Sequence, residues 1–255
     1  MSTDEGARPA FEISPAPEAV GLFDALSALD GVAHAVTTRH AVDPQLVRAD
    51  PDAAGALLAR RLGLDGLAFA RQVHRADVLR VDAPGPAGEA DALVTDRPGL
   101  GLMGFSADCP LILAADAGGG AVGAAHASWR GTVRRVAARL VEAMVREFSA
   151  APGRIVACIG PGAGPCCYEV GPEVRDAAVE ALGPEAQRFF RAQPGGAFLF
   201  DLWQANRAEL LGAGLAPENV HAAGVCTICR NDLFPSYRVE ADSAGRFAAV
   251  IGRTA

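Results

Sequence analysis

His74, Cys109 and His126 each lie just after a predicted β-strand, although the three strands are far apart in the sequence. Two imidazoles and one thiolate suit Zn²⁺, and three protein ligands leave one tetrahedral position open, as in catalytic rather than structural zinc sites. Water in that position would have its pKa lowered toward about 7. The sequence therefore indicates a candidate zinc centre, provided that the three strands end side by side.

The same residues allow two other interpretations. Each histidine could be a hydrogen-bonded core or surface residue, with Cys109 a buried thiol. Alternatively, Cys109 could be a nucleophile that His74 or His126 activates. A thiolate that coordinates zinc is occupied as a ligand, so the metal and nucleophile hypotheses exclude each other at full metal occupancy.

A strand, a turn and a helix start follow one another over residues 121–132. Backbone N–H groups at a helix N-terminus attract anions, and Arg130 adds a planar donor fork. A phosphate or a substrate carboxylate would fit there. The alternative is a structural turn in which Trp129 packs inward and Arg130 pairs with a carboxylate.

Four further cysteines lie in the second half of the chain. Cys166 and Cys167 belong to a Gly- and Pro-rich loop over residues 160–171, which matches neither a Walker A nor a Rossmann pattern. Cys226 and Cys229 form a CxxC, which could be a redox pair or, with Cys166 and Cys167, a Cys₄ zinc site. Adjacent cysteines rarely chelate one ion comfortably, and no thioredoxin-like βαβ pattern surrounds the CxxC. We therefore expect these thiols to line a pocket and not to bind metal.

The elements that must position these residues alternate irregularly. Several short strands are predicted between residues 68 and 125 with no long helix among them, which favours α+β or mixed sheets over a doubly wound parallel fold. We expect a flexible arm over residues 1–19, with one short strand at 11–13, and a single domain over 20–255. Strands are predicted at 32–38, 68–73, 78–81, 92–95, 100–105, 111–115, 121–125, 155–159, 220–225 and 248–251, and helices at 53–64, 132–148, 172–182 and 202–213.

Composition excludes several classes of protein. Half of the 255 residues are hydrophobic and 21% are charged, so the chain can build a full core and is not disordered as a whole. With 23 Lys and Arg against 30 Asp and Glu and no basic run, it is unsuited to nucleic acid. The N-terminus lacks the pattern of a secretory signal, and no apolar run approaches the roughly 20 residues that span a bilayer. We therefore expect a cytoplasmic protein whose six cysteines are thiols, metal ligands or core residues.

Taken in order, these segments resemble the YfiH-like laccase-domain family, which is also called the polyphenol oxidase or purine nucleoside phosphorylase family. The resemblance covers residues 34–251, nearly the whole chain. The matching residues are Gln72-Val73-His74, Ala107-Asp108-Cys109-Pro110, His126-Ala127-Ser128-Trp129-Arg130-Gly131, the Gly160–Gly171 loop, Asp201 with Asn206, Cys226-Thr227, Ser236-Tyr237-Arg238 and Gly245-Arg246.

The resemblance implies a single α+β domain of packed mixed β-sheets flanked by helices, with zinc held by His74, Cys109 and His126. It also implies phosphorolysis of the purine nucleosides adenosine, inosine, guanosine and methylthioadenosine, with adenosine deamination as a further activity. Editing of peptidoglycan precursors is attached to some members. The implied partners are a purine nucleoside and phosphate, while the oligomeric state is left open.

Residue roles follow from this resemblance as expectations. Arg130 would position the phosphate, and Arg39 would help to hold the nucleoside. Asp108 would shuttle protons during deamination or orient a ligand histidine. Cys166 and Tyr168 would contact the substrate. The alternatives are a Cys109-dependent hydrolase or amidase acting on a cell-wall precursor, and a non-catalytic metal- or protein-binding partner.

The chain departs from the family pattern near the expected substrate pocket. Ser128 replaces the usual glycine, Val239 replaces a second arginine, and the segment after Arg39 lacks the usual Gly-Gly-Val-Ser. The three expected metal ligands are intact. A multicopper oxidase is excluded, because such enzymes need many imidazoles, commonly as His-x-His, and the chain has five histidines and no such pair. Copper could still enter a His₂Cys site in vitro, since Cu²⁺ outcompetes Zn²⁺ for most ligand sets.

Overall fold

The computed structural model describes residues 10–16, 18–118 and 120–255. Its helices are α1 (Asp24–Ser27), α2 (Pro44–Ala49), α3 (Pro51–Leu62), α4 (Trp129–Val133), α5 (Val136–Phe148), α6 (Pro172–Leu182), α7 (Leu202–Gly212) and α8 (Tyr237–Glu240). Its strands are β1 (Phe11–Ile13), β2 (Val20–Phe23), β3 (Val32–Thr37), β4 (Gly66–Arg71), β5 (Val78–Arg80), β6 (Gly85–Glu89), β7 (Ala92–Thr95), β8 (Leu100–Ser106), β9 (Leu111–Asp116), β10 (Val122–His126), β11 (Ile155–Ile159), β12 (Glu169–Val170), β13 (Phe190–Ala192), β14 (Phe198–Phe200), β15 (Val220–Ala222) and β16 (Phe247–Arg253).

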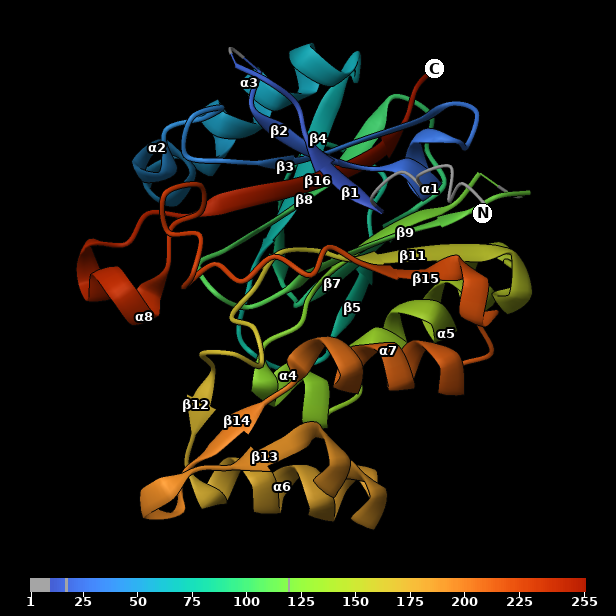
Figure 1. Cartoon of the computed structure of the whole chain (residues 1–255). Helices are drawn as coiled ribbons and strands as arrows, with labels where there is room; N and C mark the ends of the chain where they lie inside the picture. The colour runs from blue at the N-terminus through green and yellow to red at the C-terminus, as the bar shows by residue number, and fades with distance from the viewer. Residues whose placement is uncertain (1–9, 17, 119) are drawn as a thin grey trace, which may run out of the picture.

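Two large β-sheets pack against each other at the centre of the protein (Figure 1). One has seven strands in the order β1-β2-β3-β16-β8-β4-β6, and the other has six in the order β15-β11-β9-β10-β7-β5. Both mix parallel and antiparallel pairs: β4 runs parallel to β8, for example, whereas β9 and β10 are antiparallel. A third sheet, β12-β14-β13, packs with α6 at one end of the molecule. This arrangement confirms the predicted α+β fold of packed mixed sheets.

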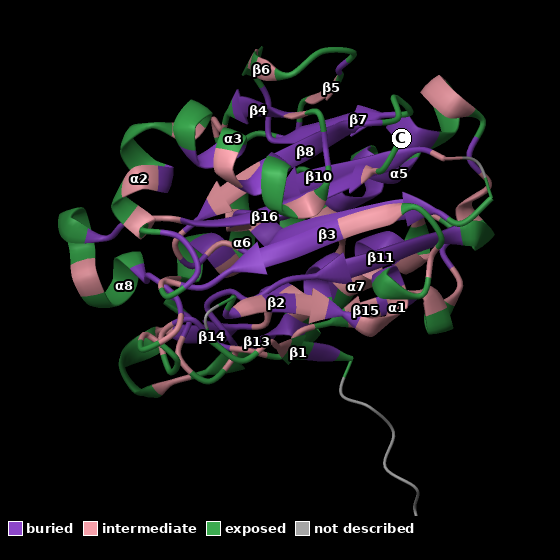
Figure 2. Cartoon of the chain, turned by 90° about the horizontal axis from the view of Figure 1, so that it is seen from above, coloured by how far each residue is buried: buried purple, intermediate pink, exposed green. Residues whose placement is uncertain are grey.

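Apolar side chains from both large sheets form the central core. Leu102 and Ile251 of the seven-stranded sheet and Leu111 and Val122 of the six-stranded sheet are almost wholly buried there. Helices α2 and α3 cover the outer face of the first sheet, and α5 and α7 cover that of the second. Figure 2 shows the strands buried along most of their length between these helical layers. Because both faces of these strands are covered, their sequences are apolar runs rather than alternating patterns.

The helix predicted over residues 132–148 is two helices in the structure. Ser128 caps α4 by accepting a hydrogen bond from the N–H of Gly131 at 3.1 Å. The chain then turns at Arg135, whose φ of +65° is left-handed, before α5 begins. Arg135 is held there by an ion pair with Glu209 of α7, at 2.9 Å. A tertiary contact thus interrupts an apolar pattern that suggested one continuous helix.

Within the arm predicted over residues 1–19, the structure describes residues 10–16, 18 and 19. The predicted strand at residues 11–13 is present as β1, which pairs antiparallel with β2 and packs Phe11 into the central core. Residues 1–9 and 17 lie outside the described part of the chain. Among the described residues, no helix is both long enough and apolar enough to cross a membrane.

Candidate metal centre and adjoining cavity

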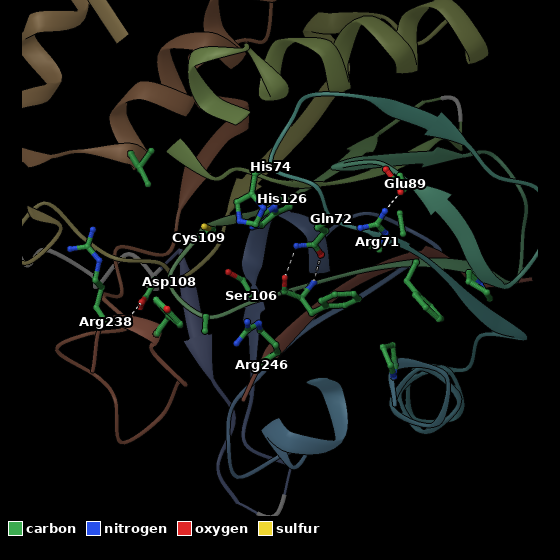
Figure 3. Close-up of a pocket in the computed structure, with 18 of the residues that line it drawn as sticks. Arg71, Gln72, His74, Glu89, Ser106, Asp108, Cys109, His126, Arg238 and Arg246 are labelled. Atoms are coloured by element: carbon green, nitrogen blue, oxygen red, sulfur yellow. Dashed lines mark hydrogen bonds and ion pairs between the residues drawn. The ribbon is translucent and has the colours of Figure 1, made fainter. Parts of the chain in front are cut away.

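Three strand ends bring His74, Cys109 and His126 together. His126 ends β10 and pairs with Leu111, the first residue of β9, so Cys109 lies at the same edge of the sheet. His74 follows β4 of the facing sheet. One ligand atom from each of the three side chains lies within 4.8 Å of the other two, and the two imidazole rings meet at 89° with their centroids 4.9 Å apart. Figure 3 shows the three side chains gathered at one place.

A buried carboxylate, Asp91, positions both histidines. Its Oδ1 accepts a hydrogen bond from His126 Nδ1 at 2.9 Å and another from the backbone N–H of His74 at 3.0 Å, while Oδ2 accepts from the N–H of Arg75 at 2.6 Å. Because an ionised carboxylate only accepts, Nδ1 of His126 carries the proton and Nε2 is left as the ligand atom. The contact at His74 also holds that residue at a left-handed φ of +58°.

Asp91 was not among the predicted site residues, and Asp108 was predicted either to shuttle protons or to orient a ligand histidine. Asp108 instead accepts hydrogen bonds from the Thr227 hydroxyl at 2.7 Å and from the backbone N–H of Arg238 at 2.8 Å. It therefore binds two loops together and makes no hydrogen bond to either histidine. The only signal for Asp91 in the sequence is an acidic residue directly before the apolar run that forms β7.

The electrostatics of the three side chains favour a bound cation. Burial opposes the protonation of His126, but the neighbouring Cys109 and Asp91 outweigh it and raise the pKa of His126 to about 9. Burial, together with the proximity of His126, lowers the pKa of His74. Burial also opposes the ionisation of Asp91, yet its hydrogen bonds from His126 and Arg75 lower its pKa overall. Two imidazole nitrogens and one cysteine sulfur, with the Asp91 carboxylate bonded to His126, form a donor set that fits Zn²⁺ or a similar transition-metal ion.

A cavity of about 790 Å³ opens beside these three residues. This volume suits a nucleoside-sized ligand, since small-molecule sites measure roughly 300–1,000 Å³. In Figure 3, Asp108 and Arg238 lie on the left of the cavity, the Arg71–Glu89 ion pair lies on the right, and Arg246 lies below His74, Cys109 and His126. Tyr168, predicted to contact the substrate, also lines the cavity.

Arg246 lies in the cavity wall, and among the described residues its side chain donates hydrogen bonds only to backbone carbonyls. It is half-buried, and burial lowers its pKa from the ordinary value, although an arginine remains charged. Its Nη1 donates to the carbonyl oxygens of Ala244 and Gly245 at 3.1 and 2.8 Å. In the described part of the chain it makes no ion pair, whereas Arg71 is paired with Glu89. A desolvated cation without a counter-ion is suited to an anionic ligand.

Arg39, Arg130 and Cys166, predicted to bind substrate, do not line this cavity. Arg39 pairs with Glu240 at 2.6 Å and so fastens the segment after β3 to α8. Arg130 stacks on the Trp129 ring, 4.4 Å from its centroid. It lines a separate, shallower depression, which shares Tyr168 and Arg238 with the main cavity.

Cys166 belongs to a cluster of four thiols with Cys167, Cys226 and Cys229. None of the four lines the main cavity, contrary to the sequence-based expectation. The sixth cysteine, Cys158, is buried within β11.

Known proteins resemble this chain in both sequence and fold. The family described as multi-copper polyphenol oxidoreductase laccase matches residues 43–254. A purine nucleoside phosphorylase of Deinococcus radiodurans is 43% identical over 199 residues, 77% of this chain and 75% of that protein. The purine nucleoside phosphorylase YlmD of Geobacillus stearothermophilus is 36% identical over 192 residues, 71% of this chain and 70% of that protein. The crystal structure of YlmD from that organism superimposes with a TM-score of 0.85 at 29% identity, covering 97% of this chain and all of that one.

Proposed function

The chain belongs to the laccase-like family described as multi-copper polyphenol oxidoreductase, and from that premise we propose that it is a zinc-dependent purine nucleoside phosphorylase. Relatives that bear this name share 36–43% of their residues with it. The observation that carries the proposal is the His74, Cys109 and His126 set, which opens on a nucleoside-sized cavity with the half-buried Arg246 in its wall.

Zinc suits the donor set better than a copper cluster does. Within residues 10–16, 18–118 and 120–255, the two groups of side chains that could hold a metal contain only His74 and His126 as imidazole donors. A multicopper centre needs many more. When bound, Zn²⁺ would supply a Lewis acid with a coordination position open toward the cavity.

Phosphorolysis requires an oxygen of phosphate to attack C1′ of the ribose while the bond from C1′ to the purine nitrogen breaks and its electron pair leaves with the base. The protein must hold a phosphate anion beside a planar, largely apolar base. Arg246 and Arg238 provide the cationic wall, and Phe69, Phe105 and Tyr168 provide the apolar one. Holding both reactants in line lowers the entropic part of the barrier.

In this proposal, Asp108 and Arg130 have roles that differ from those expected from the family resemblance. Asp108 is held by Thr227 and by the Arg238 backbone, so it fixes the loop that carries Arg238. Arg130 lies in the adjoining depression, where it would attract phosphate toward the cavity without contacting it.

A Cys109-dependent hydrolase is the second candidate, because Asp91, His126 and Cys109 are arranged in the order of a catalytic triad. The second imidazole, His74, has no role in a triad but completes a metal-ligand set. The position of His74 beside Cys109 and His126 therefore favours the metal-dependent phosphorylase over the hydrolase.

The test is the release of purine base from a panel of purine nucleosides, with and without inorganic phosphate. It compares the purified enzyme, the chelator-treated enzyme and the enzyme reloaded with Zn²⁺ or Cu²⁺. We expect base and ribose 1-phosphate to form only with phosphate, and activity to disappear with the metal and return with Zn²⁺. Phosphate-independent turnover that survives metal removal and stops when Cys109 is alkylated would establish the hydrolase instead.

A further inference from the structure

The thiols of four cysteines, which come from two segments far apart in the sequence, lie close together. Cys166 and Cys167 lie in the loop between β11 and β12, and Cys226 and Cys229 lie in the segment after β15. Each offers one sulfur, and the four sulfurs all lie within 4.8 Å of one another. Cys229 Sγ is 3.6 Å from Cys166 Sγ and 3.3 Å from Cys167 Sγ.

Backbone pairing sets this arrangement. Gly162 and Cys226 form an isolated parallel β-bridge, in which the N–H of Gly162 donates to the carbonyl of Val225 at 3.2 Å and the N–H of Thr227 donates to the carbonyl of Gly162 at 3.0 Å. The following chain turns at Gly164, whose carbonyl accepts from the N–H of Cys167 at 2.9 Å. This turn carries the two adjacent cysteines to the CxxC segment.

The spacing of the sulfurs matches a tetrahedral thiolate site. With Zn–S bonds of about 2.3 Å, the corners of a tetrahedron lie about 3.8 Å apart. The Sγ–Sγ distances of 3.6 and 3.3 Å at Cys229 lie just below that value, and the 4.8 Å upper limit on the other Sγ–Sγ distances lies above it. Adjacent cysteines rarely bind one ion together. Here the turn at Gly164 places the sulfurs of both Cys166 and Cys167 within 4.8 Å of the sulfurs of Cys226 and Cys229.

Backbone N–H groups further support a coordinated sulfur at Cys226. Its Sγ accepts a hydrogen bond from the N–H of Gly164 at 3.3 Å and further backbone hydrogen bonds from Ile228 and Cys229. Donors from the residues that follow a CxxC cysteine stabilise negative charge on its sulfur. Four thiolates at this spacing would repel one another, so their ionisation together would require a cation between them.

We propose that Cys166, Cys167, Cys226 and Cys229 bind a second Zn²⁺ ion, in a closed structural site distinct from the His74–Cys109–His126 centre. Four soft thiolates select Zn²⁺ over the hard cations Mg²⁺ and Ca²⁺. With all four positions occupied by protein, this ion has no open position for substrate, so its role is to hold structure.

The second zinc site would stabilise two parts of the main cavity wall, one at Tyr168 and one at Asp108. Tyr168, which lines the cavity, directly follows Cys167. Thr227, which lies between Cys226 and Cys229, donates its hydroxyl hydrogen bond to Asp108, the neighbour of the metal ligand Cys109. Loss of the ion would therefore loosen the nucleoside-binding wall while leaving His74, Cys109 and His126 in place.

The metal content of the full chain, purified under reducing conditions without chelator, tests the proposal. The wild-type protein should hold about two zinc ions per chain, and Cys166→Ser and Cys229→Ser should each hold about one. Both residues are exposed, so these substitutions leave the core intact. Cys109→Ala should retain one ion, and its combination with Cys229→Ser should retain none. The matched control is Cys158→Ala, a cysteine outside the cluster, which should keep both ions.

Cobalt replacement identifies the ligands without relying on activity. The Co²⁺-loaded Cys109→Ala variant should keep the intense near-ultraviolet thiolate-to-cobalt absorption of a four-sulfur site, and Cys229→Ser should lose most of it. Unchanged zinc in Cys166→Ser and Cys229→Ser, or a Cys109→Ala protein without zinc, would overturn the proposal. So would a wild-type protein in which these thiols are found joined as disulfides. None of these outcomes depends on phosphorylase activity, so the proposed function can fail independently.

Discussion

Asp91 and His126 form a buried carboxylate–imidazole pair, with Asp91 Oδ1 2.9 Å from His126 Nδ1. Asp91 precedes β7 and His126 ends β10, and these two strands are hydrogen-bonded neighbours. The backbone N–H of His126 also donates to the carbonyl of Asp91, at 2.7 Å. The pairing of two strands therefore fixes the ring that faces Cys109, and several predictions about the metal centre depend on it.

Asp91→Asn should weaken metal binding without changing any metal ligand. An amide at this position can donate to Nδ1 of His126 and so favour the tautomer with its proton on Nε2, which cannot bind metal. Loss of such an outer partner typically lowers metal affinity about 10- to 100-fold. The measurement is the zinc dissociation constant, obtained by competition with a chelator. Asp77→Asn, an exposed carboxylate in the same region, is the control and should bind zinc normally; equal affinities for the two variants would remove Asp91 from the metal centre.

His74→Ala and Cys109→Ala should each abolish zinc binding at the three-ligand centre, because two remaining ligands hold Zn²⁺ poorly. The variants should keep the circular dichroism of the parent, since neither side chain is in the central core. His40→Ala, an exposed histidine bonded to the carbonyl of Asp232, serves as the control. A full complement of zinc in either ligand variant would contradict the assignment.

Metal affinity should rise with pH over the range set by His126. Its pKa in the metal-free protein is about 9, above the ordinary 6.5, so below pH 9 an entering cation must displace a proton. Apparent zinc affinity should therefore increase at least about tenfold per pH unit from 6.5 to 9 and flatten above. In the metal-free protein the same shift stabilises the fold fully below pH 6.5, and this stabilisation is lost as the pH rises through 9.

Competition titrations at several pH values measure the affinity, and melting temperatures of metal-free and zinc-loaded protein measure the stability. The melting temperature of the metal-free protein should fall over this range more than that of the zinc-loaded protein. An affinity that does not change between pH 6.5 and 9 would show that His126 is not protonated in the free site.

Arg246→Ala should reduce kcat/KM for phosphate more than Arg130→Ala does. Arg246 lines the cavity and makes no ion pair with any described residue, whereas Arg130 stacks on Trp129 outside the cavity. A hydrogen bond to a charged group contributes about 1.5–3 kcal/mol, which corresponds to a loss of roughly 10- to 150-fold. Arg246→Lys should recover only part of the rate, because lysine keeps the charge without the fork.

Phosphorolysis rates at varied phosphate, measured beside the melting temperature of each variant, separate binding from folding. If Arg130→Ala lost more of its kcat/KM for phosphate than Arg246→Ala, the phosphate site would instead lie at the start of α4, beside Arg130. Equal losses in rate and in thermal stability for Arg246→Ala would assign Arg246 to the structure of the C-terminal segment instead.

Much of the fold follows from local sequence. Most predicted strands and the helices at α3, α6 and α7 are present within a few residues of their expected bounds. The elements that were missed, such as β2, β6 and the small sheet of β12, β13 and β14, are short and depend on partners elsewhere in the chain for their hydrogen bonds. Gly85–Glu89, for example, was not among the predicted strands and becomes β6 because β4 pairs with it.

Residue types and local elements were enough to indicate the available chemistry: two imidazoles and a cysteine sulfur at strand ends, and a CxxC with two further thiols. These features depend on residue type and on the ends of local elements, which neighbouring residues largely set. Which of these groups act together depends on long-range contacts. Strand pairing placed Asp91 rather than Asp108 beside His126, and the turn at α4 directed Arg130 away from the cavity that Arg246 lines. The bridge between Gly162 and Cys226 brought four thiols within ligand range. The physical reason is that a side chain's partner depends on which backbones pair and where they turn, and those contacts join residues far apart in the chain.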